Sequence, residues 1–385
     1  MEGMEFVDNF IHKRAGVLLC EQCKITFQDS VFHHNSGSQE GGVISMSFSN
    51  ATIRHCLFSL NYAKLFGAVI TSGSDSDLSV EDCQVIGNGI SLPDHDVAWK
   101  TLSKGKASGN GSESEESLRE CYSRVAGNPN DDDLDPDSDS SLPSTTSKEV
   151  WENCIFPFSE NVRLNFSQIL EEIEWKQSDV SFLGGCFDVV HGSQFTVEST
   201  VFSHNFGAYG SVLHLSSDAV AEIRSSTHNN NYNNLCEDSG VPNGSTIAAF
   251  HSVLTLTDST FTDNASSCGT AGVTSKESKI TITGSTFTTS SSTPLPSHLY
   301  LYSNSTPNLR NSTFKTNTDQ KSPLITLLSC QNIEITNITV ESEQTHAPTL
   351  VVHGFDTLNL LELTVLGVQS FEFFDGDECQ LKDVK

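Results

Sequence analysis

Apolar and polar residues alternate over short stretches of this chain, and these stretches recur with a period of about 26 residues. Within one period, Ile25 and Phe27 alternate with polar residues, Phe32 follows five positions later, and Val43-Ile44 comes after two glycines. Spacing of two with Val, Thr, Ser and Asn is typical of strands and excludes a helical repeat. Each period therefore predicts three short strands, each with one buried face.

The most regular signal is a Phe-x-x-Asn motif followed by a loop and a Gly-led apolar strand. Val85 takes the place of Phe in one copy, and the copy at 227–234 is degenerate. We predict that Phe stacks inside each coil and that Asn forms a ladder at a bend, because Asn tolerates left-handed backbone and its amide can bond copies above and below. The predicted ladder residues are Phe32, Asn35, Phe58, Asn61, Asn88, Phe202, Asn205, Phe261, Asn264, Phe287, Phe314 and Asn317.

A fixed period of three short strands predicts an all-β fold, a single right-handed parallel β-helix solenoid. Parallel crossovers are overwhelmingly right-handed, which sets the expected hand. At one coil per period the chain would form about eleven coils. A sandwich or barrel is the alternative, but neither explains the period.

One interval departs from the pattern. The loop between Asn and Gly is short after Asn35 but holds about 90 residues after Asn88. We predict coils at 1–90, an insertion at 91–180, and the remaining coils of the same β-helix at 181–385. The insertion has an acidic centre that predicts disorder, and its apolar spacing favours a short helix near 166–176.

The formal net charge is −28 and the sequence pI is about 4.6, so the surface should repel phosphate backbones. We therefore expect no nucleic-acid partner. We also expect no membrane span, because no run of about 18 apolar residues occurs. The start of the chain resembles a repeat more than a signal peptide, which suggests a fragment, a mispredicted start or an intracellular protein.

The chain has 11 cysteines. Cys20 and Cys23 form a lone CxxC pair without a second pair at metal spacing, and a structural role is favoured over zinc or redox chemistry. Cys56 and Cys83 occupy equivalent positions of neighbouring repeats, so we expect two stacked, buried cysteines. We predict no metal site and no cofactor.

Candidate catalytic residues are Asp29, His55 and Asp82, which share one outward position on three consecutive repeats. Neighbouring coils lie about 5 Å apart, so these side chains should be adjacent. An acid and a base at this distance could cleave a glycan, but no cleft or fixed carboxylate separation is encoded. No row of Lys or Arg accompanies these residues, and the signatures of the β-helix pectinases are absent.

Candidate binding residues are Trp99, Trp151 and Trp175. All three tryptophans of the chain lie in the insertion. They could anchor the insertion, or they could form an aromatic recognition platform.

The repeats resemble those of the chlamydial polymorphic outer membrane proteins, which carry Phe-x-x-Asn and Gly-Gly-Ala-Ile. The resemblance is carried by Phe32 and Asn35 with Gly41-Gly42-Val43-Ile44, and by Phe58 and Asn61 with Gly67-Ala68-Val69-Ile70. It implies a right-handed β-helix passenger, surface display and adhesion. Similar repeats occur in β-helix proteins of protists.

Three functions are compatible with these observations. The first is a non-enzymatic extracellular or cell-surface β-helix whose loops recognise a protein or glycan ligand. The second is a polysaccharide-active enzyme of the lyase or hydrolase class, and the third is an intracellular scaffold.

Overall fold

A computed structural model gives the fold of the chain. It describes residues 1–7, 9–11, 15–33, 35–37, 40–63, 66–90, 185–207, 209–233, 245–266, 270–289, 297–316, 322–342, 348–367 and 371–382. Two compact units are distinguished, Met1–Ser91 with Gln177–Lys385 and Leu92–Lys176. The second unit lies outside the described residues. The helix predicted near 166–176 and the predicted boundaries at 90 and 180 therefore stay predictions.

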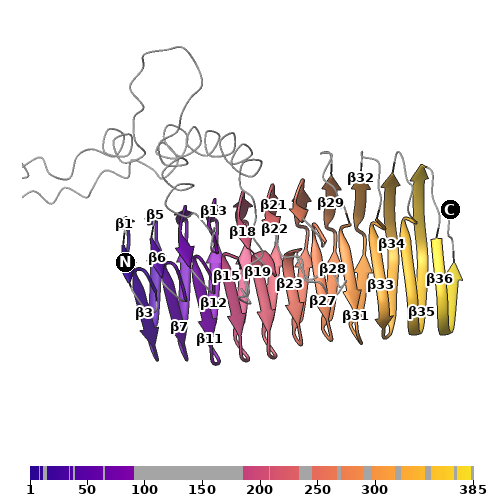
Figure 1. Ribbon diagram of the computed structural model, residues 1–385, viewed down its shortest axis with the longest axis horizontal. Coiled ribbons are helices and arrows are strands. Elements are labelled where there is room, and N and C mark those ends of the chain that lie inside the picture. Colours follow the sequence, from indigo (N-terminus) through magenta and orange to yellow (C-terminus); the bar gives the residue numbers. More distant parts are fainter. Residues whose placement is uncertain are drawn as a thin grey trace, which may run out of the picture. The chain divides into compact units, whose positions relative to one another are not determined.

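The first unit is a parallel β-helix in which each turn stacks on the next (Figure 1). The first strands of successive turns are β3 (Leu18–Glu21), β7 (Ile44–Ser47), β11 (Ile70–Gly73), β15 (Phe187–Val190), β19 (Gly210–Ser216), β23 (Ser245–Phe250), β27 (Val273–Lys276), β30 (Leu299–Tyr302) and β33 (Ile325–Cys330). The second strands are β4 (Lys24–Gln28), β8 (Asn50–Arg54), β12 (Asp77–Glu81), β16 (Gln194–Glu198), β20 (Val220–Arg224), β24 (Val253–Thr257), β28 (Lys279–Thr283) and β31 (Thr306–Arg310).

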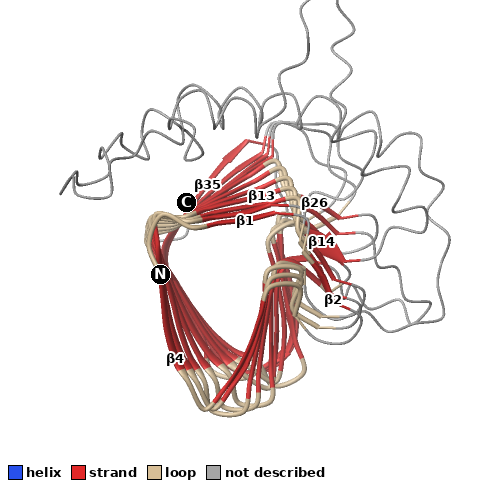
Figure 2. Ribbon diagram, turned by 90° about the vertical axis from the view of Figure 1, so that its left-hand side faces the viewer, coloured by secondary structure: helices blue, strands red, loops and turns tan. Residues whose placement is uncertain are grey.

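The third strands are β1 (Glu5–Val7), β5 (Val31–His33), β9 (Leu57–Ser59), β13 (Gln84–Ile86), β17 (Val201–Ser203), β21 (Thr227–Asn229), β25 (Thr260–Thr262), β29 (Thr286–Thr289) and β32 (Thr313–Thr316). A separate seven-stranded side sheet contains β2 (Phe10–Ile11), β6 (Ser36–Gly37), β10 (Tyr62–Ala63), β14 (Gly89–Ile90), β18 (Phe206–Gly207), β22 (Tyr232–Asn233) and β26 (Ala265–Ser266). Viewed along the stack, the three strands of a turn enclose the core and the side sheet lies beside them (Figure 2).

Strand register follows the repeat of the sequence. Phe32 pairs with Phe58, and β11 pairs with β15 although about 115 residues separate them along the chain. In the described part of the chain, eight three-stranded turns run from β3–β5 to β30–β32. They are followed by β33 with β34 (Ile333–Ser342), β35 (Leu350–Gly367) and β36 (Phe371–Lys382), in which single long strands run past the corners. The predicted parallel β-helix with a spacing of about 26 residues is confirmed.

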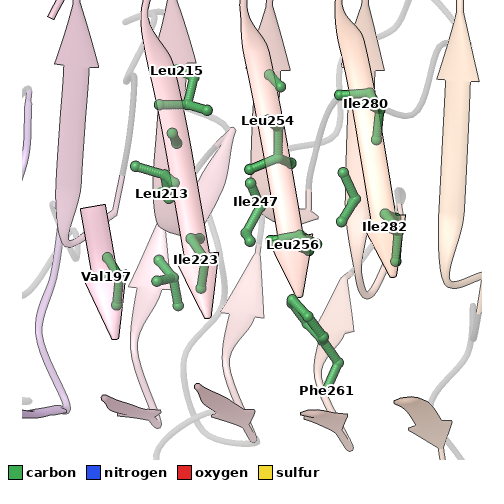
Figure 3. Close-up of a cluster of buried hydrophobic side chains, with 14 of the residues drawn as sticks. Val197, Leu213, Leu215, Ile223, Ile247, Leu254, Leu256, Phe261, Ile280 and Ile282 are labelled. Carbon is green, nitrogen blue, oxygen red and sulfur yellow. The ribbon is translucent and has the colours of Figure 1, made fainter. Parts of the chain in front are cut away.

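The core is a continuous apolar column. Alternate residues of the first and second strands point inward, and Figure 3 shows such side chains, among them Leu213 and Leu215 of β19 and Leu254 and Leu256 of β24. Each of these four residues is at most 1% exposed. Burying one such side chain stabilises the fold by about 1.5–3 kcal/mol.

Two of the corners have constant length. The corner between the second and third strands, here called the second corner, and the corner between the third strand and the side sheet, called the third corner, are two residues long in each three-stranded turn where the structure describes them. The first residue of each corner has a positive φ, as in His55 (50°) and Leu60 (53°). Its successor, Cys56 or Asn61, points inward and is buried.

The inward side chain of each corner joins a hydrogen-bond ladder. At the third corner, Asn61 donates from its backbone N–H and from Nδ2 to Oδ1 of Asn88, at 2.9 Å each. Asn88 repeats this with Asn205 at 3.0 and 3.2 Å. The ladder contains Asn9, Asn35, Asn61, Asn88, Asn205, Asn231 and Asn264. Asn317 lies outside the described residues.

Candidate functional site

The three candidate catalytic residues lie side by side at the second corner of consecutive turns. His55 Nδ1 is 3.2 Å from Asp29 Oδ1, and His55 Nε2 is 3.7 Å from Asp82 Oδ2. The three side chains are 34–50% exposed. The histidine thus lies between two carboxylates on an exposed corner of constant length.

Backbone geometry explains why these residue types occur at the second corner. Asp29, His55 and Asp82 have φ values of 51°, 50° and 50°. Asn, Asp and His are the non-glycine residues most enriched in the left-handed region, and glycine enters it freely. The same φ recurs along the column, at Ser199, Ser225, Asp258, Gly284, Asn311, Asn337 and Glu362. The conformation of the corner accounts for the three residues without any catalytic role.

Cys56 and Cys83 lie directly beneath this surface and take the place of hydroxyl groups. The second-corner ladder continues as Thr200, Ser226, Ser259, Ser285 and Ser312. The Cys56 backbone N–H points to Sγ of Cys83 at 3.3 Å, and the Cys56 thiol donates to the carbonyl of Arg54 at 3.1 Å. Burial raises the pKa of the Cys83 thiol well above its usual value, whereas the hydrogen bond with Cys83 lowers the pKa of Cys56. Both are buried hydrogen-bonding groups of the ladder.

A buried acid–base pair on another face was not anticipated from the sequence. Asp188 of β15 and His214 of β19 point outward from neighbouring first strands, and Asp188 Oδ1 lies 2.7 Å from His214 Nδ1. The two side chains are only 4% and 2% exposed. The rings of Tyr209 and Phe250 lie 6.3 and 5.7 Å from the His214 ring.

The geometry of this pair places a hydrogen bond between Nδ1 of His214, as donor, and the carboxylate of Asp188, as acceptor. A side chain that is 2% exposed cannot meet a polymeric substrate, so the pair orients β15 and β19 relative to each other. The sequence contained one signal for it, since an outward Asp and His in equivalent strand positions 26 residues apart must become neighbours.

The degenerate copy at 227–234 hides two further ladder members. His228 takes the place of Phe and stacks between Phe202 and Phe261, with ring centroids 4.8 and 4.3 Å away. Asn231 bridges Asn205 and Asn264 with Nδ2–Oδ1 distances of 3.0 and 2.9 Å. Reading this copy as His-x-x-Asn would have found both residues. Elsewhere the aromatic stack is Phe6–Phe32–Phe58 and Phe261–Phe287–Phe314, with centroid distances of 4.5–4.9 Å.

The predicted cysteine pair and the possibility of a metal site can be examined in the described residues, whereas the three tryptophans cannot. Cys20 and Cys23 form a disulfide at the corner between β3 and β4. Within the described ranges, no three His, Cys, Asp or Glu side chains are grouped so as to hold a metal ion. Trp99, Trp151 and Trp175 lie outside those ranges.

The largest length variation occurs in one connection of the turn, which runs from the side sheet to the first strand of the next turn. The corner between the first and second strands varies only between two and three residues. We call the connections from the side sheet to the first strand the loop edge. Its members are residues 12–17, 38–43, 64–69, 91–186, 208–209, 234–244 and 267–272. The strands that flank them stack in register, so the connections all start and end on the same side of the turns.

The described corners and strands define the class of protein as a right-handed parallel β-helix. The family described as "right handed beta helix region" matches residues 2–111. No curated protein matches the chain. In the described part of the chain, no helix has the length and apolar character needed to span a bilayer.

Two solved structures match this chain over most of their length. One is the periplasmic alginate epimerase AlgG, 9% identical, with 87% of this chain and 76% of the epimerase covered and a TM-score of 0.32. The other is PfbA, a surface adhesin of Streptococcus pneumoniae, 11% identical, with 98% of this chain and 77% of the adhesin covered and a TM-score of 0.33. A second PfbA structure has 9% identity and a TM-score of 0.24. Scores of this size do not establish a shared function.

Proposed function

We propose that this chain is a non-enzymatic β-helix that presents its loop edge to a protein or glycan ligand at an extracellular or cell surface. One observation carries the proposal: the second and third corners keep two residues, while the loop edge ranges from residues 208–209 to residues 91–186. Loops held by a rigid scaffold are where proteins place recognition residues, because these segments can change without disturbing the core.

The charge of the chain narrows the range of ligand classes to be tested. A formal net charge of −28 disfavours polyanions such as nucleic acids and highly sulfated glycans. Neutral or basic glycans and proteins with a basic surface are therefore the ligand classes to test. The acidic insertion, with its tryptophans Trp99, Trp151 and Trp175, belongs to residues 91–186, the longest connection of the loop edge.

The proposal is tested with loop replacements that keep the β-helix intact. In one variant, residues 92–176 are removed; in a second, residues 234–244 are replaced by the short connection 38–43. The matched control is the triple variant D29A/H55A/D82A at the second corner. Binding to a glycan array and to immobilised surface and matrix proteins should fall at least tenfold in a loop variant and stay unchanged in the control. Full binding by a variant that lacks both loops contradicts the proposal.

A polysaccharide-active enzyme is the second candidate, because His55 lies between two carboxylates on neighbouring turns. In that reading His55 transfers a proton and Asp29 or Asp82 orients it. Turnover of acidic and neutral polysaccharides would be measured for the wild-type chain and for H55A. Turnover that disappears in H55A supports this candidate, and absence of turnover on the whole panel removes it.

A further inference from the structure

His228 is the polar member of an otherwise apolar aromatic stack. It is 0% exposed, and its ring lies parallel to that of Phe261, with an interplanar angle of 1° and centroids 4.3 Å apart. Neither Nδ1 nor Nε2 has a hydrogen-bond partner. A buried imidazole without a partner loses its hydration and gains no hydrogen bond in return, which weakens this position even when the ring is neutral.

No charged group of the described core faces His228 to stabilise a proton. The stack presents Phe202 and Phe261, and the first and second strands around it present the aliphatic side chains seen in Figure 3. Asp188 is the one buried carboxylate among the described residues, and it points outward to His214. His298, the other fully buried histidine of the core, differs because its Nε2 lies 3.1 Å from the carbonyl of Lys315.

Two more defects fall between the same two turns, β19–β21 and β23–β25. The serine ladder of the corner between the first and second strands runs through Ser49, Ser76 and Ser193, and is interrupted by Ala219. The Ala219 backbone N–H donates to the carbonyl of Ser216 instead, and the Ser252 hydroxyl, one turn further on, has no partner. The side-chain oxygen of Asn229 is also buried without a partner. The unpartnered polar groups of His228, Asn229 and Ser252 thus all lie in the two neighbouring turns β19–β21 and β23–β25.

We propose that the interface between the turns β19–β21 and β23–β25 is an acid-sensitive joint, at which protonation of His228 separates the two halves of the β-helix before the terminal turns open. The protonated ring would lie in the apolar core without hydration and without a hydrogen-bond acceptor, so the proton is taken up when the stack opens. The proposal does not depend on which ligand the loop edge binds.

The direction of the pH dependence follows from linkage. Burial lowers the pKa of His228 from 6.5 to about 3, so the opened state binds the proton more tightly than the closed state. The contribution of the neutral ring to the free energy of opening is fully present above the pKa of the opened state, about 6.5, and is lost as the pH falls toward 3. Between pH 7 and pH 5 the opening equilibrium should rise about 25-fold from this group alone.

The test compares the wild-type chain with H228F, which restores the aromatic residue of the neighbouring turns. Urea unfolding and hydrogen exchange with mass-spectrometric readout are measured at pH 7 and pH 5. In the wild type, the protection factors of amides in β21 and β25, which already correct for the chemical exchange rate at each pH, should fall about 25-fold from pH 7 to pH 5. H228F should abolish that fall, whereas H251Q, a change at an exposed histidine, should retain it.

H228L serves as a second non-titrating variant in case the phenylalanine does not fit. Acid sensitivity that is the same in the wild type, H228F and H228L overturns the proposal. Protection that falls in the terminal turns at pH 5 while β21 and β25 stay protected also overturns it. Loss of the pH-dependent fall in protection in both His228 variants, together with its retention in H251Q, supports it.

Discussion

The second corner and the loop edge lie in the same turns but obey different rules. At the second corner, the first residue of each turn adopts a left-handed backbone conformation and the second joins a buried hydrogen-bond ladder, as do Asp258 and Ser259. At the loop edge, the chain leaves one turn and enters the next without such a constraint, so the connections differ widely in length. The difference shows that this solenoid varies most in length where no side-chain ladder passes through the connection.

A short insertion should give the largest difference in stability between the second corner and the loop edge. Three residues, Gly-Ser-Gly, placed between Asp258 and Ser259 would remove Ser259 from its ladder and shift the chain against its neighbours. We expect a loss of more than about 4 kcal/mol in the free energy of unfolding. The same insertion between Gly240 and Val241 should cost less than about 1 kcal/mol, because loop closure entropy depends weakly on length. Urea unfolding of both variants measures the contrast, and similar losses would contradict it.

Removing a ladder amide should have the next largest effect. Asn205 donates to Asn231 Oδ1 at 3.0 Å and to the carbonyl of Val85 at 2.8 Å, and it accepts from Asn88. N205A deletes these bonds and leaves buried groups of three turns unpaired, so we expect a loss of about 3–4 kcal/mol. N308A, on the outward face of β31, is the control and should stay within about 0.5 kcal/mol. Unfolding by urea tests both.

Backbone strain at the second corner should be measurable at Asp258, whose φ is 49°. D258V places a β-branched residue in the left-handed region and should cost about 1–2 kcal/mol. D258G should be neutral, since the position already holds Gly284 one turn later. Thermal unfolding compares the pair. Equal stability of the two variants would show that the corner tolerates any residue.

The smallest effect is expected for Cys56. C56S keeps a donor for the carbonyl of Arg54 and an acceptor in the ladder, so stability should change by less than about 1 kcal/mol. C56V removes the hydrogen-bonding group and adds about one methyl group of volume to a buried site, and should cost about 1–2 kcal/mol. Unfolding measured under reducing conditions separates them. A C56S variant as unstable as C56V would show that the thiol is not interchangeable with the ladder hydroxyls.

Much of the β-helix could be predicted because its contacts repeat. Phe32 and Phe58 share a position in the repeat, and stacking of consecutive turns brings them to 4.7 Å. Asp29, His55 and Asp82 could be placed together by the same argument. The argument did not distinguish a catalytic file from a corner that requires positive φ, because both place polar residues at one outward position of each turn.

The residues that the sequence analysis missed depend on orientation and burial. Asp188 and His214 appear as outward polar residues, yet they are buried, and no periodic pattern predicts what covers an outward face. His228 and Asn231 were hidden because the motif was sought through its phenylalanine. The cost of His228 lies in the absence of a partner for its ring nitrogens, which depends on everything packed around the ring.

The period, the strands, the parallel stacking and the connection with the largest length variation could all be inferred from the sequence alone. These follow from local alternation and from one repeat being placed on the next, so they need no knowledge of distant contacts. Tertiary structure alone decided that the second-corner residues adopt left-handed backbone, that two thiols complete a hydroxyl ladder, and that His228 is enclosed between two phenylalanine rings. Those outcomes depend on which side chains meet across turns and on whether each buried polar atom finds a partner there.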